Sequence, residues 1–412
     1  MSKLTTDLIH HPYVPPAGFA APQPGVFKAS TVIFPNVAAM HARDWKNKNG
    51  YTYGLHGTPT TFMLEERIAA LEGGKQCILV PSGLAAIANV SMALLKSGDE
   101  VLIPDNAYGP SKALADGELK NWGISHQLYD PMKPDDLRSR IGPKTRLVWL
   151  EAPGSVTMEF VPLAQLAAVC RERGVTSALD NTWGAGLAFN GFDLGRGARR
   201  ASGGGADIVV QALTKYPSGG GDVLMGSIVT RDDALHLQLK LTHMRLGWGV
   251  GGNDAEAVLR ALPSLELRYR AQDAAARSLA AWLELRPEIA QLLHPAFESS
   301  PGHAHWRELC GGDGKGDGVA AGGAAAGLFS VVFDPRFGAA QVDAFCDALK
   351  LFKLGYSWGG PVSLVVPYDV PSMRSARLAT WPHKGVLVRF SLGLEAVEDL
   401  RADLEQALAA LR

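Results

Sequence analysis

Short apolar runs alternate with helical stretches along the chain as far as residue 254. The runs have the length and the apolar character of buried strands, and several helical stretches carry apolar residues at three-to-four spacing. This alternation predicts βαβ units around a large, mostly parallel, seven-stranded sheet. The predicted strands are 76–80, 100–104, 124–129, 146–151, 175–180, 206–213 and 224–230, and the predicted helices are 61–71, 83–95, 111–121, 163–173 and 232–244.

The pattern changes near residue 254 and predicts a smaller α+β domain. A long helical run through Arg286 precedes strands at 328–333 and 385–392 and a final amphipathic helix at 395–411. We therefore expect three parts. They are a proline-rich N-terminal arm (1–60), a large α/β domain (61–254) and a C-terminal domain (255–412).

The segment 311–327 consists largely of glycine and alanine. Side chains this small offset little of the entropy lost on ordering, so the segment is expected to form a mobile surface loop.

Composition excludes several classes of protein. The 412 residues include 40 basic and 41 acidic side chains, a formal net charge of −1, which does not indicate a nucleic-acid-binding surface. Residues 76–95 are uncharged, but Pro81, Ser82 and Gly83 interrupt the stretch, so no membrane span is expected. The proline-rich start lacks the apolar core of a secretory signal. We expect a cytoplasmic protein.

Metal and dinucleotide sites are both disfavoured. The four cysteines lie far apart in sequence without a C-x-x-C motif, and His303 and His305, interpreted as solvated loop residues, have no third ligand nearby, so no metal is expected. The stretch 247–252, GWGVGG, matches G-x-G-x-x-G. It follows a helical stretch late in the domain, however, whereas a dinucleotide motif follows the first strand of a βαβ unit.

Three strand ends carry groups that together suit a phosphorylated carbonyl cofactor. Pro81, Ser82, Gly83 and Leu84 follow an apolar strand and open an uncharged helix, whose free N–H groups favour a phosphate. Asp180 and Lys215 follow two other strands. A partly desolvated lysine suits covalent bonding to a carbonyl, and a carboxylate can face a pyridinium nitrogen. Each feature alone also occurs at strand ends that bind nothing.

Several motifs, in order along nearly the whole chain, resemble the Cys/Met metabolism (trans-sulfuration) family of fold-type-I pyridoxal phosphate (PLP) enzymes. Two segments, 356–360 (YSWGG) and 386–395 (VLVRFSLGLE), resemble the cystathionine β-lyases of that family most. The γ-lyases and γ-synthases usually carry leucine at the position of Trp358. The motifs that carry the family resemblance are 51–60, 71–74, 81–83, 106–108, 150–155, 180–183 and 214–216.

The resemblance implies roles for residues around PLP. Lys215 would bond to the cofactor and then move the Cα proton of the substrate, while Asp180 would keep the pyridine nitrogen protonated. Tyr108 would stack on the ring. The phosphate would be held by three residues, Gly83, Leu84 and Thr214.

The resemblance also implies a substrate site and an oligomer. Arg389 would grip the α-carboxylate beside Ser357, and Tyr356 and Trp358 would shape the pocket. Taken alone, Arg389 could also be a surface arginine at the end of an edge strand, and Trp358 a packing residue. Tyr53 would enter the site of a neighbouring subunit, in a homo-oligomer that is a dimer of dimers.

One position departs from the family pattern. Many relatives have an arginine two residues after the tyrosine equivalent to Tyr53, where it binds the cofactor phosphate of the adjacent subunit, but here Leu55 stands there, followed by His56. We hypothesise weaker cofactor retention, or compensation by His56.

The expected reaction is α,β-elimination of L-cystathionine or a related cysteine S-conjugate to a thiol, pyruvate and ammonia. The alternative on the same scaffold is γ-elimination or γ-replacement, as in methionine γ-lyase, cystathionine γ-synthase, cystathionine γ-lyase or O-acylhomoserine sulfhydrylase. Two further alternatives are a regulatory protein that keeps the fold and an oxidoreductase that uses the GWGVGG stretch.

Overall fold

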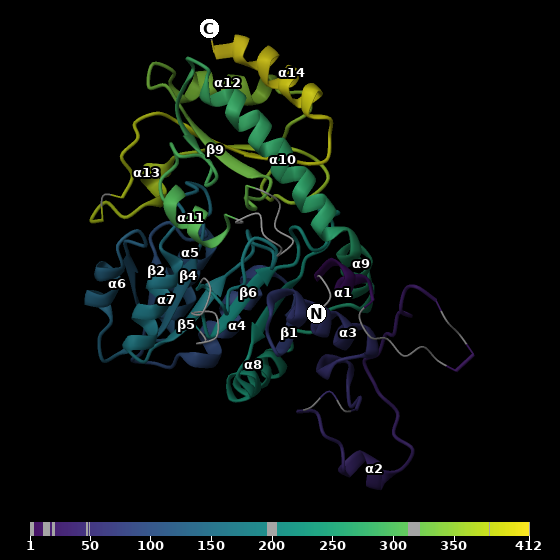
Figure 1. Ribbon diagram of the computed structural model, residues 1–412. Coiled ribbons are helices and arrows are strands. Elements are labelled where there is room, and N and C mark those ends of the chain that lie inside the picture. Colours follow the sequence, from purple (N-terminus) through teal and green to yellow (C-terminus); the bar gives the residue numbers. More distant parts are fainter. Residues whose placement is uncertain are drawn as a thin grey trace.

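The large domain is built on a seven-stranded sheet, as the alternating pattern predicts (Figure 1). The computed structural model describes residues 4–10, 17–18, 21–46, 48, 50–195, 204–311, 322–378 and 380–411. The strand order is β1-β7-β6-β5-β4-β2-β3, with β7 antiparallel to both its neighbours and the other pairs parallel. The strands are β1 Gln76–Val80, β2 Glu100–Pro104, β3 Ser125–Tyr129, β4 Thr145–Glu151, β5 Thr176–Asp180, β6 Ile208–Ala212 and β7 Gly226–Thr230.

Helices cover both faces of this sheet. Alternate residues of each central strand enter two separate apolar clusters, one packed against α3 and α7 and the other against α4 and α8. Buried parallel strands need such double coverage, which explains why they are apolar almost throughout. The helices of this domain are α3 Pro59–Glu72, α4 Gly83–Leu94, α5 Gly109–Leu114, α6 Pro134–Arg140, α7 Leu163–Glu172, α8 Asp233–Leu246 and α9 Gly252–Ala261.

The small domain packs helices on a second, five-stranded sheet with the order β10-β11-β12-β9-β8. In Figure 1 the long helix α10 (Leu265–Glu284) runs from the large domain into this layer. The other elements are β8 Ile289–Leu293, α11 His303–Leu309, β9 Leu328–Phe333, α12 Ala339–Ala348, β10 Lys353–Leu354, β11 Leu364–Tyr368, α13 Val370–Met373, β12 Leu387–Ser391 and α14 Val397–Ala407.

Three expectations for this half of the chain need correction. The helical run from residue 254 is interrupted by a 3₁₀ turn at Leu262–Ser264, where Pro263 cannot continue an α-helical hydrogen-bond ladder. His303 and His305 lie in α11 rather than in a loop. In the segment 311–327, residues 312–321 lie outside the described residues, but Ala325 and Ala326 are fully buried, so its end is not a surface loop.

The GWGVGG stretch joins two helices. Gly247 ends α8 in the left-handed conformation at φ 69°, and Gly251 is the N-cap of α9. Its glycines therefore end one helix and begin the next, and the element directly before them is a helix rather than a strand.

The N-terminal arm extends past the large domain (Figure 1). Residues 21–58 include α2 (Val37–His41), and Ile33 and Val37 are 90% and 63% exposed. No described helix is long and apolar enough to cross a membrane.

Phe345 tests the packing of the small domain. Its ring is fully buried and lies 5.2 Å from that of Phe333, between ring centroids. Phe345→Ala should lower the free energy of unfolding by about 3–5 kcal/mol, since it removes apolar contacts and leaves a cavity. Urea unfolding followed by tryptophan fluorescence measures this. Leu285→Ala, at a side chain 84% exposed, is the control, and an equal loss in both variants would contradict the assignment.

Candidate active site

Lys215 lies where the two domains meet. It follows β6 in the large domain, and its Nζ donates a hydrogen bond to Ser357 Oγ of the small domain at 2.7 Å. The same nitrogen lies 5.3 Å from the ring centre of Trp358. A primary amine is thus held between a hydroxyl and an indole, at the carboxyl end of a strand where open α/β sheets bind ligands.

Burial and a neighbouring cation make Lys215 a weaker base than an exposed lysine. Desolvation is the main cause, repulsion from Arg389 adds to it, and Asp180 opposes both, so that the pKa of Lys215 falls to about 8. A sizeable fraction of this amine is therefore neutral near pH 8, as both nucleophilic attack and proton abstraction require.

Asp180 is oriented by the residue two positions later. The Oδ1 atom of Asp180 accepts hydrogen bonds from both the Thr182 N–H, at 3.0 Å, and the Thr182 hydroxyl. The Thr182 oxygen in turn accepts the N–H of Ala212 at 2.9 Å, which ties β5 to the end of β6. Burial raises the pKa of Asp180, while the Thr182 hydrogen bonds and the charge of Lys215 oppose the rise. A cation placed against this carboxylate would keep it ionised.

Tyr108 stands at the start of α5 with its backbone N–H bonded to the half-buried carboxyl group of Glu151. Glu151 Oε2, at the end of β4, accepts that N–H at 2.9 Å. Burial raises the pKa of Tyr108, and Asp180 and Glu151 raise it further. The ring is 40% exposed, so it is free to cover a planar ligand.

Arg389 lies on β12 in the interior of the small sheet, between β11 and β9, and is only 6% exposed. The surface-arginine interpretation is therefore wrong. One of its Nη atoms donates to the carbonyl oxygen of Ser155 at 3.2 Å, and its guanidinium lies 5.2 Å from the ring centre of Tyr368. Burial lowers the pKa of Arg389. A buried guanidinium with donors to spare is suited to bind a carboxylate.

The loop that carries Ser357 and Trp358 is pressed against Lys215. Ser357 has a φ of 134°, which is rare for a residue with a side chain, and Gly359 has a φ of 78°. A Cβ at Gly359 would lie 2.8 Å from the backbone nitrogen of Tyr216, so glycine is required there. Trp358 packs edge-on against the Tyr216 ring at 5.5 Å. Trp358 is thus both a packing residue and a wall of the site.

Free backbone donors lie at the start of α4, next to Ala212 at the end of β6. The Ser82 hydroxyl caps the helix by accepting the Ala85 N–H at 3.0 Å. In the part of the chain that the structure describes, the N–H groups of Gly83 and Leu84 have no acceptor. A Cβ at Gly83 would lie 2.6 Å from the Ala212 Cβ, so only glycine fits. These donors suit an anion.

Thr214, also predicted to hold the phosphate, already has partners. Its hydroxyl donates to the carbonyl oxygen of Met225 at 3.2 Å and accepts the N–H of the same residue at 3.1 Å. Donation to a phosphate would therefore have to replace the bond to the Met225 carbonyl.

Two predicted residues lie apart from this cluster. Tyr53 and His56 contact each other edge-on, with 5.8 Å between ring centres, and His56 Nδ1 shares a 2.8 Å hydrogen bond with the Thr52 hydroxyl. Burial, with repulsion from Lys240 and Arg43, lowers the pKa of His56. A neutral imidazole binds a phosphate less strongly than arginine does.

Tyr356, predicted to shape the substrate pocket, is 82% exposed and stands at the rim of the small domain.

Sequence reasoning missed four groups that support the site. Thr182 and Glu151 lie inside motifs that were identified, but their bonding partners depend on the fold. The carbonyl of Ser155 is a backbone group and has no sequence signal. Tyr368 ends β11, a strand that the pattern did not predict.

Known proteins place this arrangement in a family. The sequence profile described as "Cys/Met metabolism PLP-dependent enzyme" matches residues 5–409. The chain belongs to this family. Its fold, its cofactor PLP and its nature as an enzyme are thereby confirmed, and the oxidoreductase and regulatory alternatives are set aside.

Individual relatives agree over nearly the full length. A putative cystathionine β-lyase of Rhizobium johnstonii is 38% identical over 94% of this chain and 91% of its own. The cystathionine β-lyase of Bordetella avium is 35% identical over 96% and 94%. The crystal structure of cystathionine γ-synthase from Xanthomonas oryzae superposes with a TM-score of 0.84 at 27% identity, covering 100% of this chain and 99% of that one.

The residues present fit the cofactor. The donors of Gly83 and Leu84 match a phosphate, the Asp180 carboxylate matches a protonated ring nitrogen, and the Lys215 amine matches the carbonyl carbon.

The pKa of Lys215 can be shifted in opposite directions by two substitutions. Arg389→Leu removes a repelling cation and should raise it above about 8, whereas Asp180→Asn removes an attracting anion and should lower it. In cofactor-free protein, the rate of acetylation at Lys215, followed by peptide mass spectrometry, should rise as pH passes the pKa. Midpoints that do not move in opposite directions would contradict the proposed electrostatics.

Proposed function

We propose that the chain catalyses α,β-elimination of L-cystathionine or a related cysteine S-conjugate. The observation that carries the proposal is the position of the Lys215 amine, which lies against Ser357 and Trp358 with Arg389 and Asp180 close enough to shift its pKa. Several relatives at 31–38% identity are named cystathionine β-lyase or putative cystathionine β-lyase, which supports the same reaction.

The residues divide the work between cofactor and substrate. When bound, PLP supplies an electron sink that acidifies the Cα–H bond of an attached amino acid. Asp180 would keep a proton at the pyridine nitrogen of the bound cofactor, and Tyr108 would cover its ring. Arg389 binds the α-carboxylate with two parallel hydrogen bonds.

Lys215 carries the proton in the reaction itself. Its neutral amine removes the Cα proton, and the Cβ–S bond then breaks, with the electron pair leaving on sulfur. The thiolate takes up the proton that Lys215 has removed and is released as homocysteine, and the three-carbon remainder reacts with one water to give pyruvate and ammonia. Ser357, by accepting a hydrogen bond from Nζ, keeps the lysine directed at this carbon.

Trp358 favours β- over γ-chemistry in this proposal. Its indole is fixed by Tyr216 and lies beside the Lys215 amine, so it limits the space into which the amine could swing toward Cγ. The γ-elimination and γ-replacement alternatives remain compatible with the fold, as the γ-synthase neighbour illustrates.

Product analysis tests the reaction. The purified enzyme with L-cystathionine should yield pyruvate and homocysteine, because β-elimination breaks the bond at Cβ. A yield of 2-oxobutyrate and cysteine would instead indicate the γ-lyase.

Lys215→Ala should lower kcat by a factor of 10³ or more, of the order seen when a central catalytic group is removed. Lys144→Ala, at an exposed side chain, is the control, and full activity in Lys215→Ala would refute the assignment.

We also propose a cytoplasmic homo-oligomer, a dimer of dimers, with sites between subunits. Tyr53 is 44% exposed, Ile33 and Val37 are more so, and a second subunit would bury such apolar arm residues. Cys77, Cys170 and Cys346 are buried free thiols, which suits a reducing compartment.

Mixing two inactive variants tests the shared site. Tyr53→Ala and Lys215→Ala should each be nearly inactive alone, since each damages every site. Co-expression of the two should restore part of the activity, because a hybrid dimer contains one site with both native residues. Cystathionine cleavage by hybrids separated with two affinity tags measures this, and Tyr53→Ala paired with itself is the control. Inactive hybrids would refute a Tyr53 contribution in trans.

A further inference from the structure

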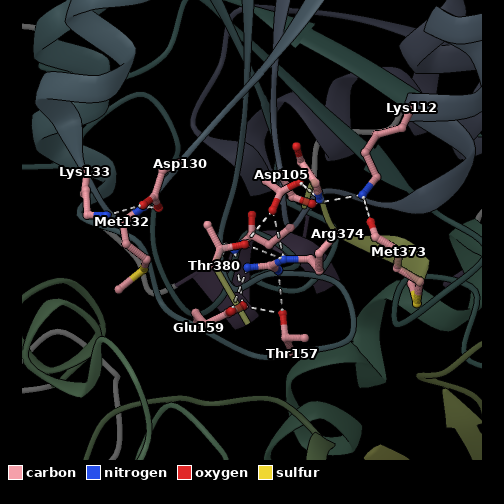
Figure 2. Close-up of polar contacts among 12 residues, drawn as sticks. Asp105, Lys112, Asp130, Met132, Lys133, Thr157, Glu159, Met373, Arg374 and Thr380 are labelled. Atoms are coloured by element: carbon pink, nitrogen blue, oxygen red, sulfur yellow. Dashed lines mark hydrogen bonds and ion pairs between the residues drawn. The ribbon is translucent and has the colours of Figure 1, made fainter. Parts of the chain in front are cut away.

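Arg374 is a buried cation outside the cluster described above, and it bonds across the boundary between the domains. It lies in the segment 369–380, between α13 and β12 of the small domain, and its side chain is 6% exposed. Figure 2 shows its guanidinium between Asp105 and Glu159, two buried carboxylates of the large domain. Arg374 Nε lies 3.1 Å from Asp105 Oδ2, and Nη2 lies 3.0 Å from Glu159 Oε1.

Further hydrogen bonds complete this group, which we call the Arg374 clasp. The hydroxyl of Thr157 accepts from Arg374 Nη1 at 3.1 Å and donates to Glu159. On the other side, the hydroxyl of Thr380 accepts from Arg374 Nε at 3.0 Å and donates to Asp105 at 2.6 Å. The clasp comprises Arg374, Asp105, Glu159, Thr157, Thr380 and Lys112.

Charge is balanced within the clasp. Lys112 Nζ donates to the backbone carbonyl oxygens of Asp105 at 2.9 Å and Met373 at 2.6 Å, and the Asp105 carboxylate attracts its charge, so the clasp contains two cations and two anions. Removal of one partner from a buried ion pair leaves an uncompensated charge, which is far more costly than loss of an exposed pair. The segment 369–380 therefore has a strongly preferred position on the large domain.

Both carboxylates belong to loops that carry groups of the candidate active site. Asp105 follows β2, three residues before Tyr108. Glu159 closes the turn after β4, where its backbone oxygen accepts the Gly154 N–H at 3.0 Å. Ser155, which follows Gly154 in this turn, supplies the carbonyl oxygen that binds Arg389. The two loops are also joined to each other, because the Ser155 N–H donates to the carbonyl oxygen of Asn106 at 3.2 Å.

We propose that Arg374 is a positioning residue for recognition of the substrate α-carboxylate. By fixing the small domain on the loops of Asp105 and Glu159, the clasp sets the position of Arg389 relative to Lys215. The proposal rests on the carboxylate-binding role of Arg389 in the proposed function. A displacement of about 1 Å in such a site can lower a rate or affinity a hundredfold.

Propionate binding to the PLP-loaded enzyme is a suitable test. Propionate has a carboxylate but no amine, so its Kd, measured by calorimetry, reports the carboxylate site without chemistry. Arg374→Met should raise this Kd, and the KM for cystathionine, by roughly tenfold to a hundredfold. The cofactor absorbance should persist, and kcat should change less than KM. Arg374→Lys, which keeps the charge, should lie between.

Control variants separate the possible outcomes. Arg336→Met removes a small-domain arginine whose side chain is 54% exposed, and it should leave Kd and KM unchanged. A lowered melting temperature in Arg374→Met with unchanged Kd and KM would overturn the proposal, since the clasp would then only stabilise the fold. If Arg374→Met fails to fold, Thr380→Val, which removes one clasp hydrogen bond, decides by the same measurements.

Arg389→Leu distinguishes this proposal from the proposed function. If Arg389→Leu leaves the Kd of propionate unchanged, the carboxylate role of Arg389 is wrong and both proposals fail. If it raises the Kd while Arg374→Met does not, only the role of Arg374 is refuted.

Discussion

The hydrogen bond from Lys215 Nζ to Ser357 Oγ is the interaction on which the candidate site depends, because it joins the end of a large-domain strand to a small-domain loop. The helix α10 supports both sides of this bond. Arg268 donates to the carbonyl oxygen of Tyr216 at 2.7 Å, and Gln272 donates to that of Gly360 at 2.8 Å. Side chains of α10 therefore hold the backbone beside Lys215 and the backbone of the loop that carries Ser357. These contacts maintain the uncommon φ of Ser357.

Burial makes the electrostatics of the site responsive to its substrate. Lys215 feels an attracting carboxylate, Asp180, and a repelling guanidinium, Arg389, in surroundings that also disfavour its own charge. An α-carboxylate bound at Arg389 would offset the repulsion, and the protonated lysine would then be better tolerated. Substrate binding would thus strengthen Lys215 as a base at the moment when a proton has to be taken from Cα.

The large domain was predictable because its strands are buried on both faces. Several runs, such as 77–80 (CILV), are apolar throughout, and the seven strands were predicted to within a few residues. The small sheet was harder to predict: β8 has Gln291 at its centre, β11 contains Pro367, and β10 is only two residues long. The motif around Lys215 indicated chemistry, whereas Arg374 stands alone in a loop, where neither periodicity nor spacing marks it.

What the sequence could not reveal is how the two domains are held together at the site. Asp105 and Arg374 are 269 positions apart, yet in the described part of the chain the donors to the buried Asp105 carboxylate are Arg374, Ser375 and Thr380, all from the segment 369–380. A carboxylate so buried would be strongly disfavoured without those donors. The loop of Tyr108 and the segment 369–380 therefore need each other to fold as they do. The same requirement that makes the boundary between domains stable also brings the residues expected to bind cofactor and substrate to one place.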